Sequence, residues 1–128
     1  MDPDGGVHLV PFCFVIEGDV LYSAVDQKPK RSRDLRRLRN LRERPRATAL
    51  IDHYEEDWSA LWWLRLRGTA RILEAEDPEA RRALALLAEK YPQYRREPPP
   101  GPVIALDVTE RRGWAAAGPG AARAPEER

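Results

Sequence analysis

Residues 61–73 read LWWLRLRGTARIL, and this stretch decides the fold class. Apolar or small residues alternate along it with arginine and threonine, which is the period-two pattern of a β-strand. It is the longest of five predicted strands. One predicted face carries Trp62, Leu64, Leu66, Gly68, Ala70 and Ile72, and the other carries Trp63, Arg65, Arg67, Thr69 and Arg71.

The other four predicted strands cover residues 7–16, 20–26, 46–54 and 103–108, which are rich in β-branched, aromatic and aliphatic residues. Pro11 interrupts the first of them, and because proline has no N–H to donate, this residue is expected at a sheet edge or a bulge. Glu17, Gly18 and Asp19 form a short polar turn, so the first two strands are predicted to pair as a hairpin.

Two helices are predicted between the strands. Residues 34–43 place Leu35, Leu38 and Leu41 on one stripe, and a proline at position 45 ends the pattern. The second helix begins at Asp77, a capping residue that proline and glutamate follow, and the proline-rich residues 97–102 form a stiff connector. The short connections between strands favour antiparallel pairing, and a small barrel would remove the open edges.

A chain of 128 residues has the size of one domain. Residues 1–114 are expected to fold, and residues 115–128 are expected to form a disordered tail of Ala, Gly, Pro and Arg. Cys13 is the single cysteine, which excludes an internal disulfide and favours a reducing compartment. No stretch approaches the roughly 20 apolar residues of a membrane span, and no signal peptide is recognisable, so a cytoplasmic protein is expected.

The positive charge of the chain is concentrated in residues 28–46. This segment holds ten basic and two acidic residues, a local charge of +8, whereas the whole chain has a net charge of +1 and the remainder therefore carries −7. A basic loop that runs into a helix places cations and backbone N–H groups at the helix N-terminus, where anions bind. From the residue types alone, a solvated helix face, a nucleotide-like cofactor and a nucleic acid all remain open.

Other kinds of chemistry find little support. His8, His53 and the lone cysteine are too few for a metal site, so none is predicted, and a hydrogen-bonded His53 before a solvated acidic loop is expected instead. The chain has no motif for a nucleophile or a phosphate loop, and no catalytic side chain is predicted. Trp58, Trp62 and Trp63 suit a planar ligand, although aromatic residues at strand spacing more often form a core or a dimer interface.

Several motifs resemble one family when they are taken in order. They are HLVPFCF at residues 8–14, LYSAVDQKPK at 21–30, LRRLRNL at 35–41, Pro45-Arg46, and DHYEEDWSALWW at 52–63. Together they resemble the pyridoxamine 5′-phosphate oxidase-like split-barrel family, in the branch that uses the deazaflavin coenzyme F-420. The resemblance spans about residues 5–114. It implies a mainly β fold, a six-stranded antiparallel FMN-binding split barrel, that forms a homodimer with two cofactor sites at the interface.

The resemblance also implies which residues bind the cofactor, and it implies no catalytic side chain. In this reading the backbone of Val10, Pro11 and Phe12 lies along the ring, and Ser23 and Ala24 flank the ribityl chain. The phosphate and the oligoglutamate tail are held by Lys28, Lys30, Arg31 and Arg37, which Asn40 supports. Trp62 or Trp63 reaches the ring of the partner.

The implied reaction is hydride transfer, through C5 of the ring, between the reduced deazaflavin and a small organic acceptor. An FMN-dependent protein of the same fold is the alternative, and a nucleic-acid-binding module built on residues 28–46 is less favoured because the chain has no recognised nucleic-acid motif. Family members usually carry an N-terminal helix and a first strand before the turn that residues 2–6 resemble. The barrel is therefore expected to lack one strand, or the natural start to lie upstream.

Overall fold

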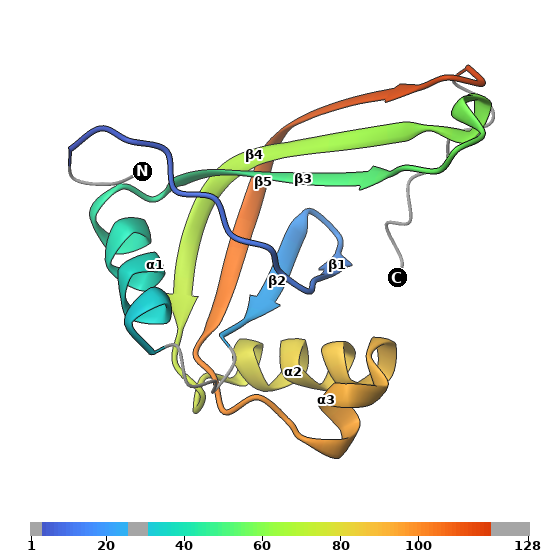
Figure 1. Cartoon of the computed structure of the whole chain (residues 1–128). Helices are drawn as coiled ribbons and strands as arrows, with labels where there is room; N and C mark the ends of the chain where they lie inside the picture. The colour runs from blue at the N-terminus through green and yellow to red at the C-terminus, as the bar shows by residue number, and fades with distance from the viewer. Residues whose placement is uncertain (1–3, 26–30, 119–128) are drawn as a thin grey trace.

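A computed structural model describes residues 4–25 and 31–118 of the chain, and for residues 31–35 it describes the backbone alone. The strands form one antiparallel sheet in the order β1-β2-β5-β4-β3 (Figure 1). The strands are β1 (Val15–Glu17), β2 (Val20–Ala24), β3 (Arg46–His53), β4 (Trp62–Leu73) and β5 (Val103–Ala115). The helices are α1 (Arg31–Glu43), α2 (Pro78–Lys90) and α3 (Pro92–Arg96), with a 3-10 turn at Trp58–Ala60.

Strand β4 lies between β5 and β3 in the sheet, and its alternating sequence predicts a strand at this position in the chain. Its apolar face packs Leu64 and Leu66 into a core cluster with residues of β2, β3 and β5, while Arg67 is exposed. A register shift lies between Arg67 and Gly68, where β4 and β5 come very close. A Cβ on Gly68 would lie 1.9 Å from the backbone oxygen of Asp107, so only glycine fits there.

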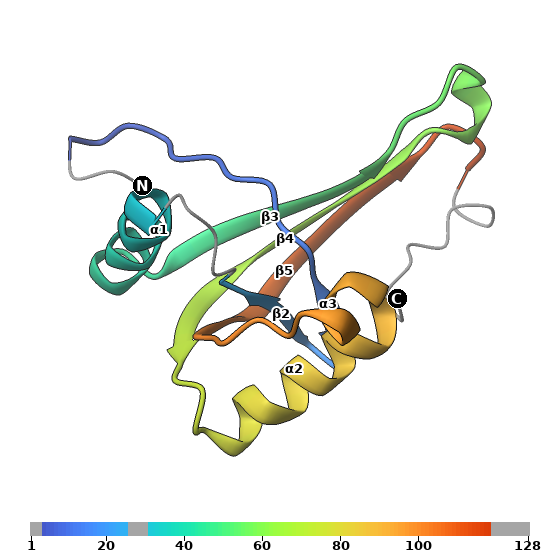
Figure 2. The ribbon, with the colours of Figure 1, turned by 60° about the horizontal axis from the view of Figure 1, so that its bottom comes forward.

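The helices cover different parts of the sheet (Figure 2). The side chain of Asp77 accepts the N–H of Glu79 at 2.8 Å and caps α2, which confirms the predicted helix start. On α2, Ala80, Ala83 and Leu87 are fully buried and pack with residues of β1, β2 and β5. Helix α1 packs on the other side of the fold, where its apolar stripe meets β4. None of the helices in the described part of the chain is long and apolar enough to cross a bilayer.

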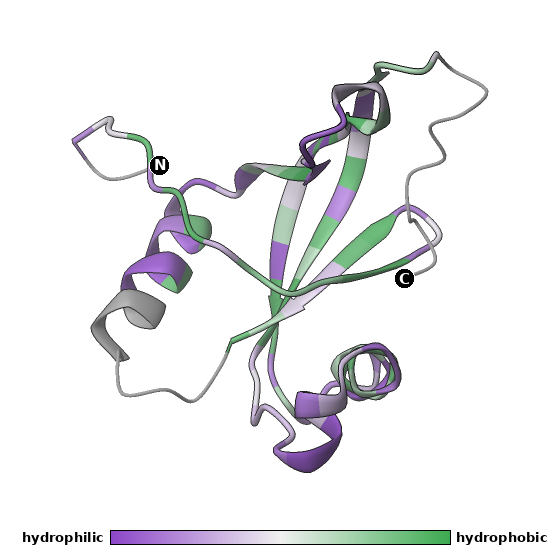
Figure 3. Cartoon of the chain, turned by 45° about the vertical axis from the view of Figure 1, so that its right-hand side comes forward, coloured by the Kyte–Doolittle hydropathy of each residue, from purple (hydrophilic) through white to green (hydrophobic). Residues whose placement is uncertain are grey.

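The segment before β1, residues 7–14, passes over the sheet between α1 and β1 (Figures 1 and 3), and we call it the N-terminal strap. Phe12 and Phe14 pack into the cluster that contains Leu66, and Cys13 packs toward α2. The predicted strand over residues 7–16 is wrong across the strap. Among the described residues, the backbone groups of residues 7–13 form no hydrogen bonds with other backbone groups, and Pro11 has no N–H to contribute.

Two other predictions need correction. Strand β5 continues to Ala115, beyond the predicted end at residue 108, because its second half pairs with the first half of β4. This also places Ala115 in the sheet instead of in a disordered tail; residues 119–128 of that tail lie outside the described residues. Helix α3, only five residues long, was not predicted. The described residues form five strands, which confirms the predicted count and is one fewer than the six of the family that the chain resembles.

Candidate cofactor site

A contact between α1 and β2 begins the candidate site. Leu38 is buried against Ala70 and Ile104, which fixes the rotation of α1 on the sheet. This rotation brings Arg37 to β2, where its Nη2 donates a hydrogen bond to the Oγ of Ser23 at 3.1 Å. Ser23 is only 3% exposed, so a guanidinium group meets a buried hydroxyl at this point. The structure thus brings together two of the predicted cofactor-binding residues.

Asn40 lies one turn further along α1 and is also only 3% exposed. Its Nδ2 lies 3.2 Å from Nδ1 of His8, in the N-terminal strap. The amide can donate to this nitrogen only when Nδ1 carries no proton, which assigns the tautomer of His8. Asn40 therefore ties the beginning of the strap to α1. His8 itself was not predicted as a site residue, since a single histidine carries no recognisable motif.

The strap and β3 border an open hollow of about 300 Å³. The three residues predicted to lie along the ring, Val10, Pro11 and Phe12, all border this hollow, together with Phe14. The opposite wall belongs to β3 and was missed by the sequence analysis, because nothing in the local sequence indicates which strand the strap will face. That wall is formed by Leu50, Ile51 and Asp52.

The remaining predicted residues lie elsewhere. The side chain of Ala24 packs into the cluster against α2, on the other side of β2 from Ser23, so only its backbone borders the Arg37 contact. Lys28 and Lys30 lie outside the described residues. Arg31 begins α1, and its side chain is not among those described.

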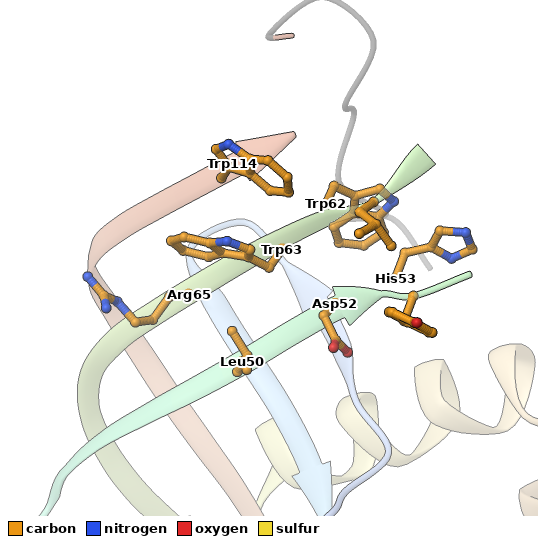
Figure 4. Close-up of a pocket in the computed structure, with 9 residues that line it drawn as sticks. Leu50, Asp52, His53, Trp62, Trp63, Arg65 and Trp114 are labelled. Atoms are coloured by element: carbon orange, nitrogen blue, oxygen red, sulfur yellow. The ribbon is translucent and has the colours of Figure 1, made fainter. Parts of the chain in front are cut away.

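Trp62 and Trp63 border a second, larger hollow of about 490 Å³ at the far end of the sheet (Figure 4). Its lining includes Trp114, which is 49% exposed, and Leu50, which is 58% exposed. We call this region the tryptophan hollow. Its lining residues are Leu50, Asp52, His53, Tyr54, Leu61, Trp62, Trp63, Arg65 and Trp114.

The contacts inside the tryptophan hollow are mainly aromatic. The rings of His53 and Trp62 are stacked with centroids 6.1 Å apart, and His53 also contacts Glu55 through Nε2 at 2.9 Å. Arg65 lies with its guanidinium carbon 5.9 Å from the ring centroid of Trp63. The Nε of Arg65 is buried and has no hydrogen-bond partner in the described part of the protein. These groups form a mostly apolar surface with one cation.

One protomer cannot bring the tryptophans to Ser23. Ser23 pairs with Ile104, which pairs with Ile72, and Ile72 lies ten residues along β4 from Trp62. At about 3.3 Å per residue, this separation is about 33 Å along the strand. Ser23 therefore lies far from the tryptophans within the chain, whereas Phe12 packs against the same core cluster as Trp62, and Leu50 and Asp52 line both hollows.

No group of three or more histidine, cysteine or acidic side chains in the described ranges could hold a metal ion. The electrostatics near Arg37 are instead those of a cationic helix. Arg36 and Arg39 are exposed on α1, and Arg42 forms an ion pair with Glu74 at 3.9 Å. The strap thus connects a basic helix, through the contact between His8 and Asn40, to a hollow bordered by Val10, Pro11 and Phe12, which suits a planar group attached to an anionic chain.

Comparisons with known proteins agree with this architecture. The chain is similar to the conserved hypothetical protein Rv2991 from Mycobacterium tuberculosis, with 21% identity and a TM-score of 0.69, over 91% of this chain and 73% of that one. It is also similar to a proposed 5-nitroimidazole antibiotic resistance protein from Bacteroides thetaiotaomicron, with 19% identity and a TM-score of 0.61, over 88% of this chain and 70% of that one. At these identities the likeness shows the fold, a split barrel. No curated protein matches the chain.

The sequence profile described as pyridoxamine 5′-phosphate oxidase matches residues 1–115, nearly the whole of the described structure. The chain therefore belongs to the pyridoxamine 5′-phosphate oxidase family, whose members are generally oxidoreductases that bind a flavin or a related cofactor.

Proposed function

We propose that the protein is an oxidoreductase that uses coenzyme F-420 and passes a hydride from the reduced deazaflavin to a small organic acceptor. The observation that carries this proposal is the basic surface of α1 beside the contact between Arg37 and Ser23. FMN ends in one phosphate, whereas the deazaflavin coenzyme carries a phosphate and a tail of several carboxylates. A helix with many arginines matches the second ligand better, because each guanidinium can bind a phosphate or a carboxylate through two donors.

The residues present fit such a cofactor. The buried hydroxyl of Ser23 and the guanidinium of Arg37 would hold the part of the cofactor that joins its ring to its phosphate. The N-terminus of α1 adds the positive end of the helix dipole, which favours an anion. When bound, the deazaflavin supplies the hydride at C5 of its ring. The protein would contribute orientation, through the side chains of Val10, Phe12 and Leu50 that border the hollow beside the strap.

We also infer that the protein acts as a homodimer. A contiguous apolar surface on a soluble protein is typical of an interface, and the tryptophan hollow is such a surface. In a dimer joined through the long strands, Trp62 or Trp63 of one protomer would reach the ring held by the other. This arrangement would bring a tryptophan close to Ser23 of the other protomer, although Ser23 and Trp62 of one protomer lie about 33 Å apart along the strands.

The test is a parallel titration of the purified protein with the deazaflavin coenzyme and with FMN. We expect the deazaflavin to quench tryptophan fluorescence, and at about 100 times its Kd to raise the stability by about 2.7 kcal/mol, or the melting temperature by about 10 °C. A response to FMN alone would identify an FMN protein of the same fold. A response to neither cofactor, with salt-sensitive binding to DNA or RNA, would favour the nucleic-acid alternative.

A further inference from the structure

Two side chains at the C-terminal end of α2, Lys90 and Tyr91, hold the backbone of Phe14. The hydroxyl of Tyr91 accepts the N–H of Phe14 at 3.1 Å and donates to its carbonyl oxygen, also at 3.1 Å. The Nζ of Lys90 donates to the same carbonyl at 2.8 Å. Both backbone polar groups of Phe14 are therefore bound by the end of α2. We call Lys90 and Tyr91 the clip.

The clip stands where a neighbouring strand would lie. β1 is an edge strand that pairs with β2 on one side only, and Phe14 comes directly before it. A single hydroxyl that both accepts from and donates to one residue reproduces the contact of a strand ladder. Burial raises the pKa of Tyr91, so its hydroxyl keeps its proton and its donor role at neutral pH.

Holding Phe14 also determines how the strap faces the sheet. Side chains alternate along extended backbone, so Phe12 and Phe14 point to the cluster with Leu66, while Cys13 points toward α2. A slip of one residue would exchange these faces. Lys90 adds a contact with the ring of Phe14, with its Nζ 3.6 Å from the centroid. The clip therefore holds both the backbone and the side chain of this residue.

The rest of the strap depends on its two ends. Within the described ranges, residues 7–13 form no backbone ladder, and the contact between His8 and Asn40 anchors the far end. The hollow bordered by Val10, Pro11 and Phe12 lies between that anchor and the clip. Loss of the contact at either end would consequently shift the backbone of Val10, Pro11 and Phe12, which border the hollow.

We propose that Lys90 and Tyr91 are positioning residues. They hold the strap in the place where Val10, Pro11 and Phe12 form one wall of the hollow beside β3, although neither Lys90 nor Tyr91 borders this hollow. This inference rests on the proposed function for the identity of the ligand. The position of the strap itself can be measured without any ligand, so the two proposals can fail separately.

The test compares the wild type with Tyr91→Phe, Lys90→Gln and Tyr22→Phe. Tyr22→Phe is the matched control, because the hydroxyl of Tyr22 also bonds to α2, at 2.7 Å to Glu79, and this bond does not involve a strap residue. Hydrogen exchange of the ligand-free protein reports the strap, and titration with the deazaflavin coenzyme reports the hollow. We expect Tyr91→Phe to speed exchange of the Phe14 amide, which donates to the Tyr91 hydroxyl, and to raise the Kd about fivefold. Lys90→Gln should act in the same direction, and Tyr22→Phe should leave both within twofold of the wild type.

Three results would overturn the positioning role. The first is unchanged exchange of the Phe14 amide in Tyr91→Phe and Lys90→Gln. The second is an equal increase in exchange in Tyr22→Phe, and the third is faster exchange with an unaltered Kd. If the wild type binds neither deazaflavin nor FMN, the proposed function fails, and hydrogen exchange alone then decides whether the clip holds the strap.

Discussion

Replacing Glu79 by glutamine would weaken a group of side chains that joins α2 to the sheet. Glu79 accepts two hydrogen bonds from Arg71, each at 3.0 Å, and one from the hydroxyl of Tyr22 at 2.7 Å. Arg71 in turn donates to Asp107 at 2.6 and 2.9 Å. The four residues come from α2, β2, β4 and β5, so losing the negative charge affects the packing of all of these elements.

The size of the effect follows from the pKa of Glu79. Hydrogen bonds from Arg71, and then from Tyr22, lower this pKa from 4.5 to about 2. At about 1.4 kcal/mol per unit this would correspond to about 3 kcal/mol. Glu79 is 34% exposed and Arg71 39%, so screening by solvent reduces the contribution to about 1–2 kcal/mol. Since the folded pKa is the lower one, this stabilisation is present above pH 4.5 and is lost as the pH falls toward 2.

The assay is urea unfolding followed by circular dichroism at pH 7 and at pH 3. We expect Glu79→Gln to lower the free energy of unfolding by about 1–2 kcal/mol at pH 7, and by about half as much at pH 3. Glu89→Gln removes one negative charge from an exposed position on the same helix and should change the stability by less than about 0.5 kcal/mol. The reasoning is refuted if Glu79→Gln matches the wild type at pH 7, or if its deficit is the same at both pH values.

Three further changes test the fold, the oligomer and the titration of a single residue. Gly68→Ala should lower the free energy of unfolding in urea by about 1–3 kcal/mol, because the new Cβ would meet the backbone oxygen of Asp107. Gly113→Ala, whose Cβ would lie 3.4 Å from the nearest atom, should lower it by less, and equal losses would contradict this reasoning. Leu50→Arg should convert a dimer into a monomer in sedimentation velocity, and a wild type that already sediments as a monomer would remove the inferred interface. Burial and then the hydrogen bond to Glu79 raise the pKa of Tyr22 to about 12. Titration of the tyrosine absorbance at alkaline pH should therefore show a step near pH 12 in the wild type that is missing in Tyr22→Phe, and identical curves for the two proteins would disprove the assignment.

The parts of the fold that the sequence predicts are those with a local physical cause. Strand β4 follows from its strict alternation, and the start of α2 follows from the capping chemistry of Asp77. The second half of β5, with the sequence TERRGWA, has no such alternation, and it is a strand because β4 lies beside it. The strap shows the opposite case, since its residues favour a strand but residues 7–13 pair with no backbone in the described part of the chain.

The residues of the candidate site likewise divide into those that the sequence indicates and those that only distant contacts reveal. The resemblance placed Ser23, Arg37 and Asn40 in the site, and the structure brings the first two into contact. His8 and Tyr91 could not be identified in advance, because each acts on a residue far away in the chain. Tyr91 and Phe14, for example, are 77 positions apart, and only the packing of α2 against β1 brings them together.

The central claim is that the basic surface of α1 holds the anionic tail of the coenzyme, and one measurement tests it most directly. Two Kd values are measured for each protein, one for the full coenzyme and one for a deazaflavin that lacks the phosphate and the glutamate tail. The ratio of the second Kd to the first is then compared between the wild type and Arg37→Met. A charge-assisted contact contributes about 1.5–3 kcal/mol, so we predict that the wild type prefers the full coenzyme at least a hundredfold and that Arg37→Met lowers this preference at least tenfold. Equal affinity of the wild type for both ligands would contradict the account.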